Sequence, residues 1–379
     1  PERSEGSGRV TLGRGAVMSH GPIPRYARND SMDRAILPIR IFSMRYLHSI
    51  AFTLTAMSVA FIDPVAAQVP IKEWPVPYAG SRPRDPFIDS QNRVWFVGQV
   101  GNYIAYLDPK TGNFKRYAIE DGALPHNLIV DKKDMVWYAG NGNGHIGKLD
   151  PASGKITRYP MPKGEARDPH TLVFDQKGDI WFTVQNGNYV GRLATATGKV
   201  DLIEVPTANA RPYGIEVDSK GRPWFNEFGS DKLATVDPAT LKLREYQMPN
   251  DRSRGRRIAI TSDDRVWYVD YTRGFLGRLD PKSGQFKEWS LPGGASALPY
   301  AMASDDQDRV WLVETGSQPN RLVGFDPKTE KFFGTTPIPS GGGTVRHMMF
   351  DEKGGQIWFG TDNNTIGRAE VSKKGDMSS

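Results

Sequence analysis

The sequence predicts an all-β fold, a seven-bladed β-propeller with four antiparallel strands per blade and a ring closed by the N-terminal strand. Seven tryptophans recur 42 to 47 residues apart, each within a short apolar segment such as RVWFVG or DIWFTV. A repeat of about 40–50 residues that is rich in short strands is typical of propellers, with one blade per repeat. The repeated tryptophans are Trp95, Trp137, Trp181, Trp224, Trp267, Trp311 and Trp358.

The four strands of one blade can be followed in residues 170–206. Apolar and polar residues alternate in the first strand, Asp175 begins a turn, and Trp181 lies in the second strand. A third and a fourth strand follow, separated by Thr197 and Gly198. Such period-2 segments between Gly, Asp and Asn clusters are typical of hairpins. The tryptophan is interpreted as a large residue wedged between neighbouring blades.

The turn between the third and fourth strands recurs as LDPKTG, LDPASG and LDPKSG. In this motif Asp accepts a backbone hydrogen bond, Pro presets φ and Gly supplies a left-handed residue. We therefore interpret the motif as structural rather than functional.

The two ends of the chain are predicted to meet in the last blade. Fourth strands read LREYQMP at 243–249 and FKEWSLP at 286–292, and the same pattern, IKEWPVP, stands at 71–77. No such segment follows residues 366–370. The N-terminal strand is therefore expected to complete blade 7, which leaves no open sheet edge.

The segment 44–67 has the pattern of a secretory signal peptide. It has a basic start, an apolar stretch at 50–62, and small residues ending at Ala67. The alternative is a retained membrane anchor, but the stretch is shorter than the ~20 residues that a spanning helix needs. We expect cleavage after Ala67, a periplasmic or secreted protein, and no stable membrane insertion after cleavage.

Besides the signal peptide, the chain is expected to consist of three segments. Residues 1–43 are interpreted as an upstream extension without a fold, residues 68–371 as the propeller, and residues 372–379 as a disordered tail. Residues 1–67 hold eight Lys or Arg and five Asp or Glu, so half of the formal charge of +6 lies outside the propeller. The small positive charge that remains on the propeller does not favour nucleic acid as a partner.

Without cysteine there is neither a disulfide framework nor a thiolate metal site. We expect a monomer.

Counting from each tryptophan predicts two rings of residues around one mouth of the central channel. The start of the inner strand and the end of the next strand lie at the same end of a hairpin. Eleven residues before the tryptophans stand Arg84, His126, His170, Tyr213, Arg256, Tyr300 and His347. Three residues after them stand Gly98, Gly140, Val184, Glu227, Asp270, Glu314 and Thr361.

These rings allow two interpretations. Neighbouring carboxylates at Glu227, Asp270 and Glu314 could hold Mg²⁺ or Ca²⁺ through oxygen ligands, and a histidine opposite them could act as a general base. Alternatively, a channel mouth is wet and tolerates any polar residue. A small-molecule ligand at the mouth would contact the first-ring residues Arg84, His126, His170, Tyr213 and Arg256.

The repeat DPHTLVFDQKGDIWFTVQNGNYVGRL, with RPYGIEVDSKGRPWFNEFGSDKL after it, resembles the virginiamycin B lyase (streptogramin lyase) family. The similarity extends over about residues 71–370. It implies a propeller enzyme that opens a cyclic depsipeptide antibiotic at its ester by elimination, with Mg²⁺ and a histidine base.

The resemblance also implies site residues. The family has a His at the entry of blade 6, then Glu-x-His and a later Glu on blade 7. Here His347 matches the base and Tyr300 stands at the blade-6 histidine, so both are catalytic candidates. Val345 replaces the first Glu, and Asp362 stands nearest the later one. The resemblance adds Asp362 to the ring carboxylates Glu227, Asp270 and Glu314 as candidate metal ligands.

Three functions compete. The first is a metal-dependent carbon–oxygen lyase acting on a cyclic or ester small molecule. The second is a non-catalytic periplasmic propeller that binds a ligand or a protein. The third, a gluconolactonase-like propeller with a channel metal, lacks this blade pattern. The sequence does not identify the substrate.

Overall fold

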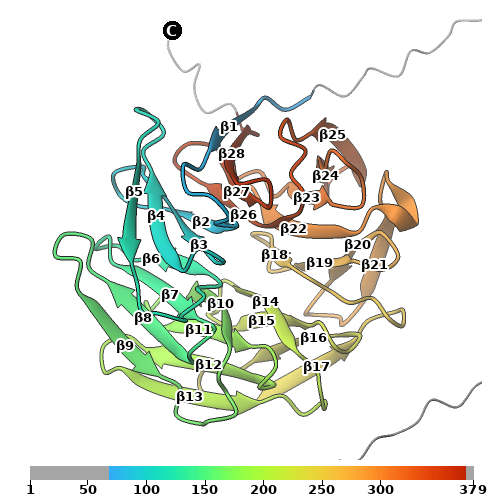
Figure 1. Ribbon diagram of the computed structural model, residues 1–379. Coiled ribbons are helices and arrows are strands. Elements are labelled where there is room, and N and C mark those ends of the chain that lie inside the picture. The colour runs from blue at the N-terminus through green and yellow to red at the C-terminus, as the bar shows by residue number, and fades with distance from the viewer. Residues whose placement is uncertain (1–67, 373–379) are drawn as a thin grey trace, which may run out of the picture. The chain divides into compact units, whose positions relative to one another are not determined.

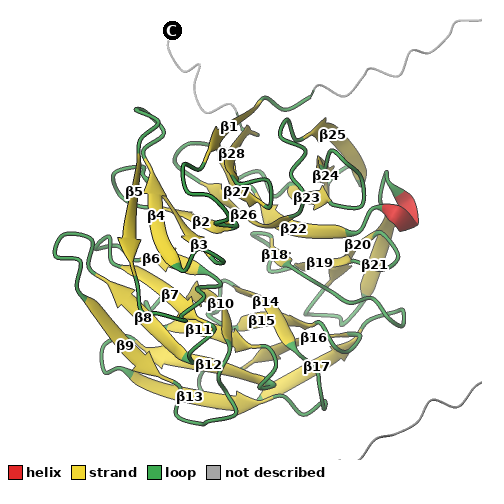
Figure 2. Cartoon of the chain, in the orientation of Figure 1, coloured by secondary structure: helices red, strands yellow, loops and turns green. Residues whose placement is uncertain are grey.

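The computed structural model describes residues 68–372. These residues form seven four-stranded antiparallel sheets arranged as a ring of blades (Figures 1 and 2). The predicted seven-bladed propeller is therefore confirmed. The expected extension 1–43, the signal peptide 44–67 and nearly all of the tail 372–379 lie outside the described residues. Within the described part, no helix is long and apolar enough to span a membrane.

Each of blades 1 to 4 takes its strands in chain order. Blade 1 consists of β2 (Pro83–Ile88), β3 (Val94–Gly98), β4 (Tyr103–Leu107) and β5 (Phe114–Ala118). Blade 2 consists of β6 (Leu128–Val130), β7 (Val136–Gly140), β8 (His145–Leu149) and β9 (Ile156–Pro160). Blade 3 consists of β10 (Pro169–Phe174), β11 (Ile180–Val184), β12 (Tyr189–Ala194) and β13 (Lys199–Glu204). Blade 4 consists of β14 (Pro212–Val217), β15 (Pro223–Glu227), β16 (Lys232–Val236) and β17 (Leu243–Gln247).

The remaining blades include the ring closure. Blade 5 consists of β18 (Ile258–Ile260), β19 (Val266–Asp270), β20 (Phe275–Leu279) and β21 (Phe286–Ser290). A short 3₁₀ helix, η1 (Gly294–Ser296), precedes blade 6. Blade 6 consists of β22 (Pro299–Ser304), β23 (Val310–Glu314), β24 (Arg321–Asp326) and β25 (Lys331–Pro337). Blade 7 combines β26 (Val345–Asp351), β27 (Gln356–Thr361) and β28 (Thr365–Glu370) with the N-terminal β1 (Ile71–Pro75).

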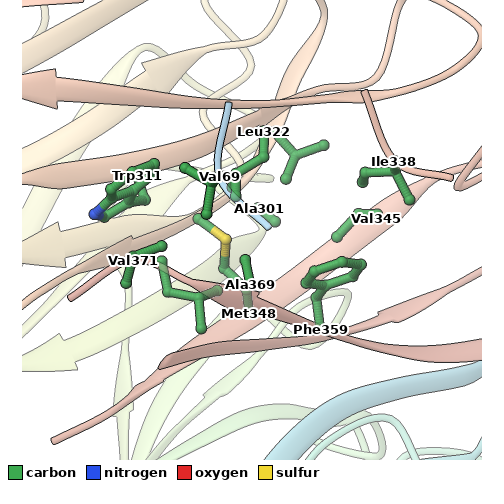
Figure 3. Close-up of a cluster of buried hydrophobic side chains, with 12 residues drawn as sticks. Val69, Ala301, Trp311, Leu322, Ile338, Val345, Met348, Phe359, Ala369 and Val371 are labelled. Atoms are coloured by element: carbon green, nitrogen blue, oxygen red, sulfur yellow. The ribbon is translucent and has the colours of Figure 1, made fainter. Parts of the chain in front are cut away.

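The N-terminal strand closes the ring as predicted. β1 pairs antiparallel with β28, with Ile71 opposite Ala369 (Figure 1). Just before β1, Val69 packs into a buried apolar cluster with Trp311 and Ala369 (Figure 3). The closure therefore joins the first described residues to blades 6 and 7, and it covers the edge that β28 would otherwise expose.

Each of the seven repeated tryptophans is at most 2% exposed. In six blades the indole Nε1 donates a hydrogen bond to the residue six positions earlier. The acceptors are Asp89, Asp131, Asp175, Asp218, Thr261 and Asp305. The turn before the second strand therefore fixes each tryptophan from its own blade. Among the described residues Trp358 Nε1 has no partner, because Asp351 stands seven positions before it rather than six.

The first strand of each sheet faces the central channel. Each of these inner strands (β2, β6, β10, β14, β18, β22 and β26) contacts the inner strands of both neighbouring blades. A register shift interrupts the inner hairpin near its entry in blades 1, 3, 4, 6 and 7. Such irregularities re-aim side chains next to functional sites, and here they lie where the predicted first ring begins.

Candidate functional site

The channel mouth is lined by residues at the start of the inner strands or, in blades 2 and 5, two positions before them. In blades 1, 3, 4 and 6 the position eleven residues before the tryptophan follows a proline that pairs with the end of the next strand. The first-ring residues of blades 1 to 6 are those the sequence predicted, namely Arg84, His126, His170, Tyr213, Arg256 and Tyr300.

The expectation that His347 is the first-ring residue of blade 7 was wrong. In the other blades the tryptophan pairs with the residue eight positions earlier, as Trp181 does with Val173. Trp358 instead pairs with Met349, nine positions earlier. The turn between β26 and β27 holds one extra residue, so Arg346 takes the first-ring position and His347 lies one residue deeper.

Aromatic side chains of the ring form a continuous arc from blade 2 to blade 6. The rings of His126 and His170 lie 3.6 Å apart between centroids, and those of His170 and Tyr213 lie 4.2 Å apart. The hydroxyl groups of Tyr213 and Tyr300 share a short hydrogen bond. These four side chains are at most 6% exposed, so they fill the mouth.

Two arginines flank the tyrosine pair. The guanidinium of Arg256 lies 4.7 Å from the ring centroid of Tyr300 and 4.3 Å from that of Phe228. The guanidinium of Arg346 lies 5.6 Å from the Tyr300 ring and donates a hydrogen bond of 2.6 Å to Asp362. Both arginines are partly exposed. They are therefore the ring members best placed to meet a ligand.

A second layer lies beneath the ring. The buried guanidinium of Arg257 donates to Thr171 Oγ1 at 2.8 Å, to Asp85 at 3.2 Å and to the backbone oxygen of Arg346 at 3.1 Å. Asn127 donates to the same Asp85 carboxylate at 3.0 Å. Burial opposes ionisation of Asp85, but Arg257 and Arg84 hold its pKa below the usual range. The layer is an ion-paired floor that joins several blades.

Arg84 links the ring to this floor. Its Nη1 donates to Gln99 at 2.9 Å, and its Nε lies 3.4 Å from Asp85. Burial disfavours the charged form, yet Asp85 and the two tyrosines raise its pKa. Arg84, Arg256, Arg257 and Arg346 therefore make the mouth strongly cationic.

The nearby arginines make the pKa values of Tyr213 and Tyr300 differ. Burial raises the pKa of Tyr213 to about 12, and the neighbouring Tyr300 adds to the rise. Burial also opposes ionisation of Tyr300, but Arg256, Arg84 and Arg257 outweigh it and lower that pKa. Of the two phenols, Tyr300 is the one that ionises more readily.

The ring histidines are neutral by the same reasoning. Burial lowers the pKa of His126 and of His170 well below the usual value, and the nearby Arg84 and Arg257 lower it further. For the deeper His347, burial is again the main cause, and its pKa falls to about 4. Protonation of each histidine is therefore disfavoured by burial and by the positive charge of the arginines.

The three expected metal-binding carboxylates do not converge. Each lies at the end of the second strand of its blade and is bound by a residue that follows it in the same blade. The pairs are Glu227 with Ser230, Asp270 with Arg273 and Glu314 with Arg321. Asp362 is paired with Arg346. Within residues 68–372, no three His, Asp or Glu side chains form a group that could hold a metal ion.

The donors at the mouth do not fit Mg²⁺. Four arginines surround the tyrosine pair, and Asp362, the acid nearest to them on blade 7, is neutralised by one of them. Magnesium is held by oxygen ligands with a negative balance, whereas this balance is positive. The sequence signal for the difference was the longer turn after Asp351, because it moves Arg346 into the ring.

Several mouth atoms lack a partner. Among the described residues, Arg84 Nη2, Arg256 Nε and His126 Nδ1 are buried without a hydrogen bond. Buried polar groups are normally satisfied, so a bound ligand with acceptor oxygens would complete this site.

Comparison with known proteins identifies the family of the sequence. The virginiamycin B lyase family model matches residues 50–188 and 143–378. A search of curated proteins found no match.

Three solved structures illustrate the shared fold. A streptogramin B lyase is 24% identical with a TM-score of 0.72, over 80% of this chain and 98% of that one. A catalytically inactive virginiamycin B lyase from Staphylococcus aureus with quinupristin gives 24% and 0.72, over 80% and 99%. The extracellular domain of a putative hybrid two-component system from B. thetaiotaomicron gives 16% and 0.61, over 81% and 43%. At these identities the likeness concerns the fold.

Proposed function

The chain belongs to the virginiamycin B lyase family, and we propose that it is a carbon–oxygen lyase that cleaves a cyclic or ester small molecule at the channel mouth. In this proposal Tyr300 is the base that removes a proton, and arginines replace the metal ion. The observation that carries it is the hydrogen-bonded pair of Tyr213 and Tyr300 beneath Arg256 and Arg346.

The elimination needs a base that gives up its own proton readily. The arginine field lowers the pKa of Tyr300, and the higher pKa of Tyr213 leaves that residue as the hydrogen-bond donor. Once ionised, Tyr300 is a stronger base than the histidines beside it, whose pKa values burial lowers. Proton abstraction by a positioned base contributes roughly 10²–10⁴-fold to a rate.

The proposed step balances without a redox partner. The Tyr300 phenolate takes the proton from the carbon next to the substrate carbonyl. The electrons of that C–H bond form a carbon–carbon double bond while the neighbouring C–O bond breaks. The leaving group departs as a carboxylate, which requires no proton. The products are an unsaturated carbonyl compound and a carboxylate, and Tyr300 returns the proton to solvent.

Charge develops on the carbonyl oxygen during this step. The cations of Arg256 and Arg346 lie over the Tyr300 ring, and Arg256 Nε and Arg84 Nη2 have no partner among the described residues. These donors can stabilise an enolate or a substrate carboxylate, the task that a divalent cation performs in the metal-dependent reaction. The proposal therefore favours a substrate that is anionic or becomes so.

Export belongs to the same proposal. The segment 44–67 has signal-peptide features, so we place the reaction outside the cytoplasm, with the protein acting as a monomer on a small molecule.

A second function, non-catalytic binding of an anionic ligand, is favoured by one observation. The tyrosines and histidines of the ring are almost fully buried, and only Arg256 and Arg346 among the ring members are partly exposed. A ligand held by these two cations need not reach Tyr300. Binding without turnover would support this alternative.

The test is a panel of linear and cyclic β-acyloxy carbonyl compounds incubated with the purified protein. Elimination gives a conjugated product that absorbs in the ultraviolet, so the readout does not require the natural substrate. Hydrolysis of the same ester gives no such absorbance. Product formation that is lost in Tyr300→Phe would support the lyase. Binding of a carboxylate inhibitor without product would support the alternative.

A further inference from the structure

A cavity lies at the end of the central channel opposite the mouth. It has a volume of about 370 Å³ and lies among the later residues of all seven inner strands. Its wall is mainly aliphatic and aromatic and includes Phe87, Phe174 and Phe350. The lining contains two carboxylates, Glu216 and Glu352, and neither lysine nor arginine. A volume of this size is in the range of small-molecule sites.

The position of Glu216 is unusual within the repeat. It pairs with Trp224 across the inner hairpin. In the other six blades the residue that pairs with the tryptophan is apolar. Those residues are Phe87, Ile129, Val173, Ala259, Ala303 and Met349. The propeller therefore tolerates an apolar residue here, and packing does not require a carboxylate in blade 4.

Glu216 is also poorly compensated. Within residues 68–372 it makes no hydrogen bond, and its one opposing charge is Arg257. That guanidinium already binds Thr171, Asp85 and a backbone oxygen. Burial raises the pKa of Glu216 to about 7, with Arg257 opposing the rise. Glu216 is partly exposed and lines the cavity. A carboxylate beside apolar walls is costly to ionise, so a role in binding would explain its presence.

The inner end of the cavity is polar but uncharged. His347 and Asn127 line it, and among the described residues His347 Nδ1 has no partner. The Asn127 amide is already bound to Asp85 and to the backbone nitrogen of Leu172. Glu216 therefore provides a recognition group on the cavity wall, and the aromatic rings of the same wall suit a cation.

We propose that this cavity binds a small organic ammonium ion with an aromatic or aliphatic body, held by an ion pair to Glu216. The apolar wall takes the body of the ligand, and the carboxylate takes its charged nitrogen. This site is separate from the mouth, because its lining includes none of the seven first-ring residues. The inference does not depend on the proposed lyase activity.

The experiment uses the full chain and two matched probes, 2-phenylethylamine in its protonated form and the neutral 2-phenylethanol. Calorimetry at pH 8, where Glu216 is mostly ionised, should show the ammonium binding about tenfold more tightly than the alcohol, as expected for a charge-assisted contact. Glu216→Gln should remove that difference. Glu204→Gln, an exposed change in the same region of the chain, should leave it intact.

A second variant locates the site without changing charge. Ala303 lines the cavity, so Ala303→Leu should fill part of it and weaken ammonium binding while Glu216 remains. Circular dichroism and the melting temperature check that each variant is folded. Equal binding of the two probes, or ammonium binding that survives Glu216→Gln or Ala303→Leu in a folded protein, would overturn the proposal.

Discussion

Tyr213 and Tyr300 stand on blades 4 and 6, 87 residues apart, and their hydroxyl groups share a hydrogen bond at the channel mouth. The pair is asymmetric, because Arg256 lies 4.7 Å from the Tyr300 ring and 5.8 Å from the Tyr213 ring. The arginines therefore favour ionisation of Tyr300, and in the proposed reaction Tyr300 rather than a histidine is the base.

Removing the Tyr300 hydroxyl should abolish elimination. Tyr300→Phe keeps the ring and its contacts with the arginines, so the fold should remain. We expect the rate of unsaturated product formation to fall by roughly 10²-fold or more, measured by ultraviolet absorbance. Tyr159→Phe is the matched control, because that ring stacks on Trp137 away from the mouth. A rate in Tyr300→Phe equal to that of the control would reject Tyr300 as the base.

Removing one cation should make Tyr300 harder to ionise. Arg256→Gln deletes a positive charge that favours the phenolate, so the pKa of Tyr300 should rise. Ultraviolet titration of tyrosinate should show this, and the acidic limb of kcat/KM should move to higher pH. Arg244→Gln, which removes an exposed arginine over Tyr246, is the control. Identical titration curves for the two variants would contradict the electrostatic explanation.

Glu216 should make stability depend on pH. Burial raises its pKa from 4.5 to about 7, so the folded state retains a proton that the unfolded state has lost between these values. This stabilisation is complete below pH 4.5 and is lost as the pH rises through about 7. Glu216→Gln should therefore be more stable than the wild type above pH 7, by about 1–3 kcal/mol.

Urea unfolding at pH 5 and pH 8 measures this effect. The gain from Glu216→Gln should be larger at pH 8, and Glu204→Gln should show no comparable difference. A gain that is the same at both pH values would mean that Glu216 ionises normally in the folded protein.

Ring closure should contribute strongly to stability. Trp74 of β1 is 8% exposed and stacks on Trp358 of β27 at 5.5 Å. Trp74→Ala should lower the free energy of unfolding by about 3–5 kcal/mol, and deletion of residues 68–78 should destabilise the whole ring. Lys72→Ala, an exposed change on the same strand, is the control. An unchanged melting temperature after the deletion would contradict closure through β1.

The fold could be predicted because its signal is repeated seven times. Each tryptophan marks one second strand, and the motif at 71–77 identifies the strand that closes blade 7. The first ring could be predicted in blades 1 to 6, where the turn between the first two strands has a constant length. The prediction of the first ring failed in blade 7, because the single extra residue after Asp351 moves Arg346 into the ring and His347 out of it.

The partners of the three second-ring carboxylates could not be predicted from spacing alone. Glu227, Asp270 and Glu314 do lie at equivalent strand ends. Their side chains are bound by partners three or seven residues further along, in loops or strands whose conformation the repeat does not specify. A ring position in sequence therefore does not show whether a side chain points to the channel or is held within its own blade.

The most direct test of the proposed reaction is turnover of β-acyloxy carbonyl compounds by chelator-treated protein, with and without added Mg²⁺. Our account predicts an unsaturated product at the same rate in both conditions, and its loss in Tyr300→Phe. Activity that disappears on chelation and returns with Mg²⁺ would contradict the assignment of the metal's role to arginines. The absence of product with every compound, beside measurable carboxylate binding, would contradict the lyase and support the binding propeller.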